Sequence, residues 1–246
     1  MVLLAIVPGI LLFLAVWKFD TVEKESPALL AKLFIFGALT ILGAILLRTL
    51  GVHVFKPLFQ YNRGIWFVFV DSFVLTALIE ECAKFLVLKL TTWKSKEFNY
   101  TFDAIVYAVV TSVGFVTAEN IVYLIKYRGA IEPMKLILPI FAQIIISIFM
   151  GYYYGLAKLE SASGNAKASK THLIEAFIVP YILHGMFEFC IGEGSVLFFG
   201  IFACYVLILT CAGVFGFIRL SQGDTMIPLP DNKTDKADDS SASEEW

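Results

Sequence analysis

The chain has 246 residues, of which 59% are hydrophobic and only 16% are charged, and its formal net charge is −2 at pH 7. A soluble domain carries roughly 25% charged residues, so this composition excludes an ordinary soluble protein. It predicts an all-α, multi-pass protein in a lipid bilayer. Seven of the 21 acidic residues lie after residue 220, and no basic cluster is present that would bind nucleic acid.

Seven apolar segments predict a bundle of about seven transmembrane helices, each of which needs roughly 17–25 residues to cross a bilayer. The first has no basic residue before it and no small-residue cleavage site after it, which favours a membrane helix over a signal peptide. Together the segments form a predicted transmembrane domain over residues 1–220. They lie at 2–17, 28–48, 66–92, 102–126, 134–158, 171–190 and 195–219.

The charges of the loops predict the orientation of the bundle. If the N-terminus is outside, loops 18–27, 93–101 and 158–171 and the C-terminal region are cytoplasmic, and these regions contain nine lysines. The opposite side contains five basic residues, so the positive-inside rule favours an N-out, C-in topology. Residues 221–246 are rich in Asp, Ser and Glu without hydrophobic periodicity, which predicts a disordered acidic tail.

The third segment contains Glu80, Glu81 and Lys84 within two helical turns. A charged residue at the bilayer centre costs roughly 2.5–3.5 kcal/mol on insertion scales, so each is a candidate functional residue. Lys84 can pair with either glutamate, which lie one turn away. One salt bridge would occupy one carboxylate and leave the other to hold a proton or act as a base. A purely structural ion pair would leave the second acid unexplained.

The fourth segment carries a stripe formed by Phe115, Glu119 and Tyr123, spaced four residues apart. Residues at this spacing share a helix face, so we expect Glu119 to face protein rather than lipid. Asp103 at the start of this segment is expected to cap the helix or to lie at the interface.

The sixth segment places His184 and Glu188 one turn apart, so the acid is a candidate partner that orients the imidazole. A helix rises about 1.5 Å per residue. By this count Glu80, Glu119 and His184 lie at depths that allow them to meet in one cavity.

These motifs, in this order on consecutive hydrophobic spans, resemble those of the PrsW-type intramembrane proteases, within the wider superfamily of CAAX prenyl endopeptidases and Abi bacteriocin-processing proteins. The resemblance covers about residues 5–220. The residues that carry it are the acidic stretch Lys18 to Pro27, Glu80-Glu81-x-x-Lys84, Gly114-Phe115-x-x-x-Glu119-Asn120-x-x-Tyr123, the Gly151-Tyr-Tyr-Tyr-Gly155 segment and His184-x-x-x-Glu188.

The resemblance implies that the protein cleaves a membrane-anchored protein in or next to its transmembrane segment, in the plasma membrane of a prokaryote. It also implies that Glu80 or Glu81 activates water. Glu119 and His184 would bind a divalent metal such as zinc, or stabilise the oxyanion if no metal is used. Four further residues of the site region are expected to support these groups: Lys84, Asn120, Gln143 and Glu188.

Two positions depart from the family pattern. The family usually has a histidine where Gln143 stands, eight residues before Gly151, and an Asp or Asn where Glu188 stands. An amide is a poor zinc ligand beside imidazole or thiolate, so Gln143 argues against a metal. It also favours an alternative, an inactive relative that binds membrane partners. A proton-coupled carrier is a further alternative because buried acids and histidines form proton relays, although no internal repeat is evident.

Overall fold

The computed structural model describes residues 2–19, 24–59, 64–128, 132–222 and 224–228. Within these ranges the chain is almost entirely helical and contains no β-strand, only an isolated bridge between Tyr100 and Met226. The elements are α1 (Val2–Phe19), α2 (Pro27–Phe59), α3 (Ile65–Phe69), the π-helix η1 (Val70–Ala77), α4 (Leu78–Thr92), α5 (Asp103–Lys126), α6 (Met134–Ala162), α7 (Ala166–Glu193) and α8 (Val196–Gln222).

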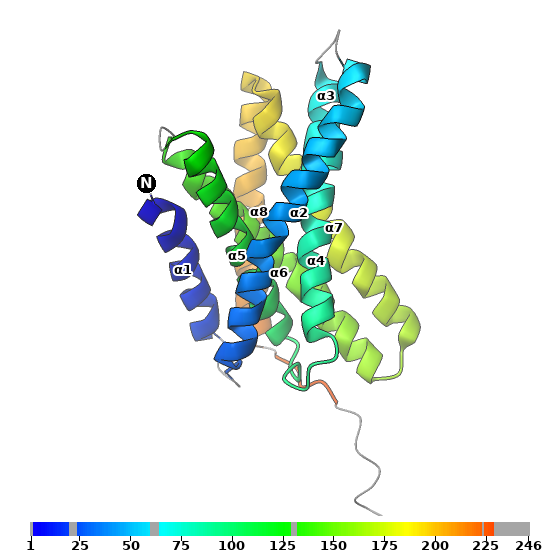
Figure 1. Ribbon diagram of the computed structural model, residues 1–246. Coiled ribbons are helices and arrows are strands. Elements are labelled where there is room, and N and C mark those ends of the chain that lie inside the picture. The colour runs from blue at the N-terminus through cyan, green and yellow to red at the C-terminus, as the bar shows by residue number, and fades with distance from the viewer. Residues whose placement is uncertain (1, 20–23, 60–63, 129–131, 223, 229–246) are drawn as a thin grey trace, which may run out of the picture.

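The helices run alternately up and down in one bundle (Figure 1). We define the upper end as the end at which α1 begins, where α2 leads into α3, α5 into α6 and α7 into α8. The lower end carries the opposite connections and the end of α8. The three loops that we predict to be cytoplasmic therefore lie at the same end, in agreement with the predicted alternation.

The predicted all-α transmembrane fold is confirmed. Each of the seven predicted apolar segments falls on helical residues, and segment 66–92 is built from α3, η1 and α4 in direct succession. In the described part of the chain, five helices are long and apolar enough to cross a membrane, namely α2, α5, α6, α7 and α8.

Helix α5 is the centre of the bundle. Its most apolar stretch is 78% buried inside the protein, against 22% to 56% for the other four candidate spans. Residues from Asp103 to Thr117 are all buried, because α2, α4 and α6 pack around them. A central helix surrounded by protein can carry polar side chains that lipid would not tolerate, and Glu119 lies near its upper end.

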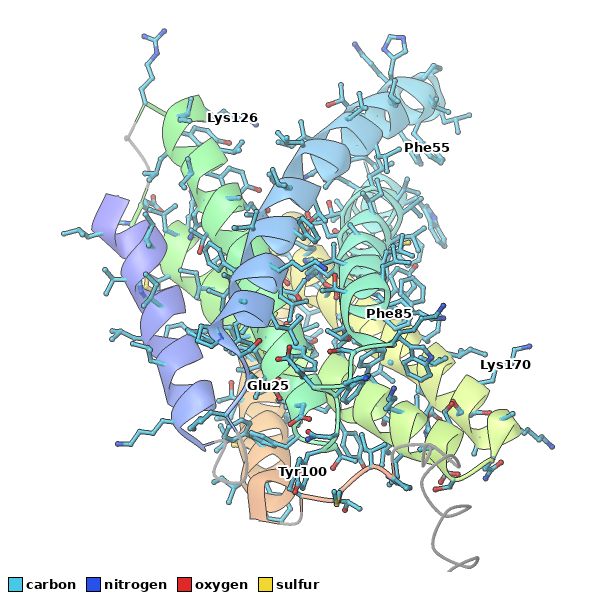
Figure 2. All side chains as sticks on the ribbon, turned by 60° about the horizontal axis from the view of Figure 1, so that its bottom comes forward. Glu25, Phe55, Phe85, Tyr100, Lys126 and Lys170 are labelled. Atoms are coloured by element: carbon cyan, nitrogen blue, oxygen red, sulfur yellow. The ribbon has the colours of Figure 1, made fainter. Side chains whose placement is uncertain are left out.

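Glycines allow the helices around α5 to approach closely. A Cβ atom at Gly37 of α2 would lie 2.1 Å from the carbonyl oxygen of Thr111, and one at Gly114 would lie 2.1 Å from that of Phe34. Helix α6 uses Gly151 and Gly155 in the same way against the first turn of α5. Small residues four apart permit such backbone contact in membranes. Figure 2 shows α2 and α5 diverging above their crossing, toward Phe55 and Lys126.

The helix that carries the paired glutamates begins with a π-helical segment. Eight residues of η1 precede α4 directly, and the Leu78 amide donates to the Phe73 carbonyl, five residues back. Such wide turns are rare and frequently lie at functional sites. Phe73 also fixes the neighbouring helix, because a Cβ at Gly185 of α7 would lie 2.3 Å from its ring. The π segment thus packs against the residue that follows His184.

The lower end is closed by the residues that follow α8. Asp224 accepts hydrogen bonds from the Phe102 amide at 2.9 Å and the Thr101 hydroxyl at 3.0 Å. The Ile227 side chain is fully buried. The sequence predicts disorder from residue 221, but α8 extends to Gln222 and residues 224–228 are held against the α4–α5 loop. The remainder of the predicted tail lies outside the described residues.

Asp103 also lies at this end, and the sequence predicts that it caps α5 or lies at the membrane interface. Its carboxylate accepts hydrogen bonds from the backbone amides of Asn99 at 3.0 Å and Tyr100 at 2.7 Å. Both amides belong to the α4–α5 loop, so Asp103 holds this loop and does not cap the first turn of α5. Nearby, the Tyr107 hydroxyl donates to Glu25 at 2.5 Å. Glu25 belongs to the acidic stretch before α2, and Figure 2 shows it with Tyr100 at this end of the bundle.

Candidate active site

The two neighbouring glutamates of α4 have different partners. Lys84 lies one turn after Glu81, and its ammonium nitrogen is 2.5 Å from Glu81 Oε1. Both side chains are about 1% exposed. Burying a charge is costly unless it is paired, and this pair neutralises both groups. The salt bridge that the sequence predicts is therefore present, and it uses Glu81.

His184 of α7 is held from both sides of its ring. Its Nδ1 lies 2.7 Å from Glu81 Oε1, and its Nε2 lies 3.3 Å from the amide nitrogen of Gln143 on α6. Lys84 donates a second hydrogen bond to the amide oxygen of Gln143. Lys84, Glu81, His184 and Gln143 thus form a closed ring of hydrogen bonds across three helices, which we call the buried ring.

The buried ring determines how the imidazole is presented. Because Lys84 donates to the Gln143 amide oxygen, the NH2 group of Gln143 faces His184 Nε2. This pattern assigns the ring proton to Nδ1, which donates to Glu81. A carboxylate that fixes one imidazole nitrogen so that the other faces the reactants is a recurrent arrangement in enzyme sites.

Glu80 has no such partner. Its side chain is buried, and its Oε2 atom makes no hydrogen bond with any described residue. This oxygen lies 3.9 Å from His184 Nε2. A buried polar atom without a partner is unusual and calls for an explanation. Glu80 is therefore the carboxylate that the salt bridge leaves free.

Two further acids complete the cluster. Glu188 Oε1 lies 3.8 Å from His184 Nε2, and this side chain is 34% exposed. Glu119 of α5 is half-buried, and its charge interacts with Glu80, Glu188, His184 and Lys84. The structure thus brings the predicted acids and the histidine together from α4, α5 and α7.

Asn120 makes a hydrogen bond to the backbone of α6. It is fully buried, and its amide nitrogen donates to the carbonyl oxygen of Leu136 on α6 at 3.1 Å. It therefore ties α5 to the first turn of α6. Of the stripe on α5, Phe115 is buried beneath Lys84, whose ammonium lies 5.3 Å from the ring centroid. The stripe faces protein, as its spacing predicts.

One ion pair beside the site was missed by the sequence reasoning. Arg48 of α2 and Asp71 of η1 form a salt bridge of 3.0 Å, and Arg48 also interacts electrostatically with Glu80 and Tyr123. Asp71 lies inside the third apolar segment. The rule that intramembrane charges are candidate functional residues would have selected it.

A buried acid–imidazole–lysine cluster within a membrane-spanning bundle defines a class of protein, an intramembrane enzyme with acid–base groups. Comparison with known proteins gives the family. The family model described as "PrsW family intramembrane metalloprotease" matches residues 25–214, and the chain belongs to this family of intramembrane proteases. The predicted protease activity is thereby confirmed. No solved structure matches the chain.

Curated relatives match most of the chain. Protease PrsW of Oceanobacillus iheyensis is 31% identical over 83% of this chain and 85% of its own length. The Clostridioides difficile protein of the same name is 32% identical over 76% and 77%. The Bacillus subtilis protein is 28% identical over 75% and 79%.

The family description implies a metal, and the side chains can be tested for one. The described residues contain no group of three His, Cys, Asp or Glu side chains arranged to hold a metal ion. The Gln143 amide nitrogen lies 3.3 Å from His184 Nε2, and it is a donor rather than a ligand. This arrangement does not fit a metal centre on Glu119 and His184.

Proposed function

We propose that the protein hydrolyses a peptide bond with Glu80 as the general base, and that Glu81 and His184 position the reacting water. The observation that carries this proposal is the difference between the two glutamates. Glu81 is bound by Lys84 and His184, whereas the buried Glu80 Oε2 has no hydrogen-bond partner among the described residues. A general base needs a free carboxylate within reach of the water that it deprotonates.

The spacing around His184 suits a water molecule. Hydrogen bonds to water are about 2.8 Å long, so one water can contact both Glu80 Oε2 and His184 Nε2, which are 3.9 Å apart. The 3.3 Å contact between Nε2 and Gln143 is long for a hydrogen bond. His184 can therefore exchange it for a bond to the water, which frees the Gln143 amide to donate elsewhere.

The reaction then follows from these positions. Glu80 takes a proton from the water as its oxygen bonds to the carbonyl carbon of the peptide. The developing oxyanion accepts a hydrogen bond from the Gln143 amide, and low polarity strengthens such contacts. Glu80 returns the proton to the leaving nitrogen as the C–N bond breaks. The products are a carboxylic acid and an amine.

The remaining residues hold this arrangement. Glu81 and Lys84 fix His184 through the buried ring. Glu119 and Glu188 bring two further carboxyl groups to the same cluster, and Glu188 Oε1 lies 3.8 Å from His184 Nε2.

The substrate that we propose is a membrane-anchored protein, cleaved in or next to its transmembrane segment. The depth of the site supports this, because Gln143 and His184 each lie about 14 Å from the upper ends of α6 and α7 at 1.5 Å per residue.

We also propose that the protein lies in the plasma membrane of a prokaryote with its N-terminus outside and its C-terminus inside. The loop charges support the orientation, and the family supports the membrane. We also propose that the protein is related to the CAAX prenyl endopeptidases and Abi proteins, because its motifs occur in the order described above.

The test compares newly formed peptide N-termini in membranes that contain the wild type or Glu80→Gln at matched levels. Glu160→Gln is the control because it makes the same chemical change on α6, near its lower end. We expect the same new termini with the wild type and with Glu160→Gln. Their amount should fall roughly 10²–10⁴-fold with Glu80→Gln, which is the usual contribution of a general base. Equal termini in all three membranes would contradict the role of Glu80.

A further inference from the structure

A cavity of about 700 Å³ is lined by residues near the upper ends of α5, α6, α7 and α8. Its wall includes Tyr123 of α5, Pro139 of α6, Phe187 and Glu188 of α7 and Phe202 of α8. A space of this size is in the range of sites that hold small molecules or side chains. We call it the upper cavity.

The upper cavity adjoins the candidate active site. Tyr123 lies one helical turn above Glu119, Pro139 one turn above Gln143, and Glu188 one turn above His184. One turn is about 5.4 Å, so three helices carry the cavity wall directly above the reacting groups. Glu188 belongs to both, since its Oε1 lies 3.8 Å from His184 Nε2.

The wall has the chemistry of a pocket for an apolar side chain. Much of it is formed by hydrocarbon and aromatic groups, including those of Leu138, Phe187, Ile191 and Phe202. Polar groups lie at the two ends. Glu188 is at the inner end, and Glu132 and Lys135 form a 3.5 Å ion pair at the exposed outer end.

Pro139 adds a backbone feature to this wall. Proline has no N–H, so it cannot donate to the carbonyl oxygen of Lys135 four residues earlier, as a helix normally requires. Both residues line the cavity. The carbonyl is therefore available to accept a hydrogen bond from the backbone of a bound peptide, which is a feature that an acyl chain could not use.

We propose that the upper cavity binds an aromatic or long aliphatic side chain of the substrate, adjacent to the bond that is cleaved. This inference rests on the proposed function, because it places the peptide against Glu80 and His184. A peptide fits better than a lipid tail, since the cavity ends on a carboxylate and carries an ion pair at its mouth. The cavity thus determines which bonds the enzyme selects.

The test measures binding without catalysis. In the full-length protein with its four native cysteines replaced by alanine, Leu138→Cys places a thiol on the cavity wall, and the half-exposed Leu138 tolerates the change. Leu86→Cys is the control, since Leu86 is 48% exposed on α4 and lies outside the cavity. The measurement is the rate of reaction with N-ethylmaleimide in detergent, with and without capped Ala-Phe-Ala, capped Ala-Asp-Ala or phosphatidylglycerol.

We expect the phenylalanine peptide alone to suppress labelling of Leu138→Cys, with no effect on Leu86→Cys. Protection by phosphatidylglycerol without protection by this peptide would assign the cavity to lipid and overturn the proposal. Equal protection by both peptides, or none, would also overturn it. Because the labelling rate reports occupancy of the cavity and does not depend on cleavage, this result is independent of the Glu80 test.

A second readout connects binding to selectivity. Leu138→Trp narrows the cavity, so it should lower cleavage next to large apolar residues roughly tenfold relative to cleavage next to small ones. The residues that flank the new N-termini report this shift. An unchanged preference with normal total cleavage would show that the cavity does not select the substrate.

Discussion

Glu80 and Glu81 are chemically identical neighbours, and the fold gives them different surroundings. Glu81 accepts hydrogen bonds from Lys84 at 2.5 Å and from His184 at 2.7 Å, while Glu80 faces His184 across 3.9 Å. Consecutive residues on a helix point about 100° apart, so the two carboxylates approach His184 from different directions, and only Glu81 hydrogen-bonds within the buried ring. This difference in direction separates a positioning residue from a base.

At the residue scale, the buried ring predicts the effect of removing its cation. Lys84→Met removes the cation from the buried Glu81 carboxylate and leaves it only the hydrogen bond from His184, which should cost about 3–5 kcal/mol of stability. The double variant Lys84→Met/Glu81→Gln removes both charges and should recover much of this loss. Thermal unfolding of the purified variants in detergent measures both effects. Equal destabilisation in the single and double variants would show that Glu81 does not depend on Lys84.

Sequence reasoning predicted these contacts only in part. The Glu81–Lys84 pair follows from helical spacing, because its members lie three residues apart. The contacts of Gln143 with Lys84 and of His184 with Glu81 join residues 59 and 103 positions apart. Periodicity within one helix carries no information about which helices meet, so the closed ring could not be predicted. The sequence indicated Gln143 as a supporting residue and as a departure from the family pattern, but it did not indicate which side chains Gln143 contacts.

At the element scale, the crossing of α2 and α5 depends on the absence of side chains. We expect Gly114→Ala to lower stability by about 1–3 kcal/mol, the usual effect of overpacking. Its Cβ would lie 2.1 Å from the backbone of α2, and backbone cannot rotate away. Gly43→Ala is the matched control, because nothing lies within 4 Å of its Cβ position.

The two glycine variants are compared by thermal unfolding and by cleavage. Gly43→Ala should be neutral or stabilising by about 0.4–1 kcal/mol, since alanine restricts the unfolded chain. A Gly114→Ala protein as stable and active as Gly43→Ala would mean that α2 and α5 are not in this close contact.

Some features of the elements follow from sequence and others do not. Apolar runs located all seven helical segments, because hydrophobic length is the main requirement for crossing a bilayer. The largest error in a predicted end is in α2, which was expected to end at residue 48 and extends to Phe59. The π segment Val70–Ala77 could not be predicted, since its residues have no propensity that distinguishes it from an α-helix. Its wide turn is stabilised by packing against α7, which is a tertiary effect.

At the scale of the whole molecule, the chain after α8 closes the lower end of the bundle. A protein that stops at Gln222 loses the hydrogen bonds of Asp224 with Thr101 and Phe102, worth about 0.5–1.5 kcal/mol each, and the burial of Ile227, worth about 1.5–3 kcal/mol. A protein that stops at Pro228 keeps every contact described for this segment. We expect only the shorter protein to unfold at a clearly lower temperature. Equal unfolding temperatures would show that residues 224–228 do not stabilise the bundle.

The central claim is that Glu80 acts on water while Glu81 positions His184. The most direct test measures cleavage and thermal unfolding of Glu80→Gln and Glu81→Gln side by side, at matched levels in the same membranes. We predict that Glu80→Gln loses cleavage with wild-type stability, whereas Glu81→Gln loses cleavage and also stability, by about 3–5 kcal/mol, because Lys84 becomes an unpaired buried charge. An active Glu80→Gln protein, or the reverse pattern of stabilities, would contradict the account.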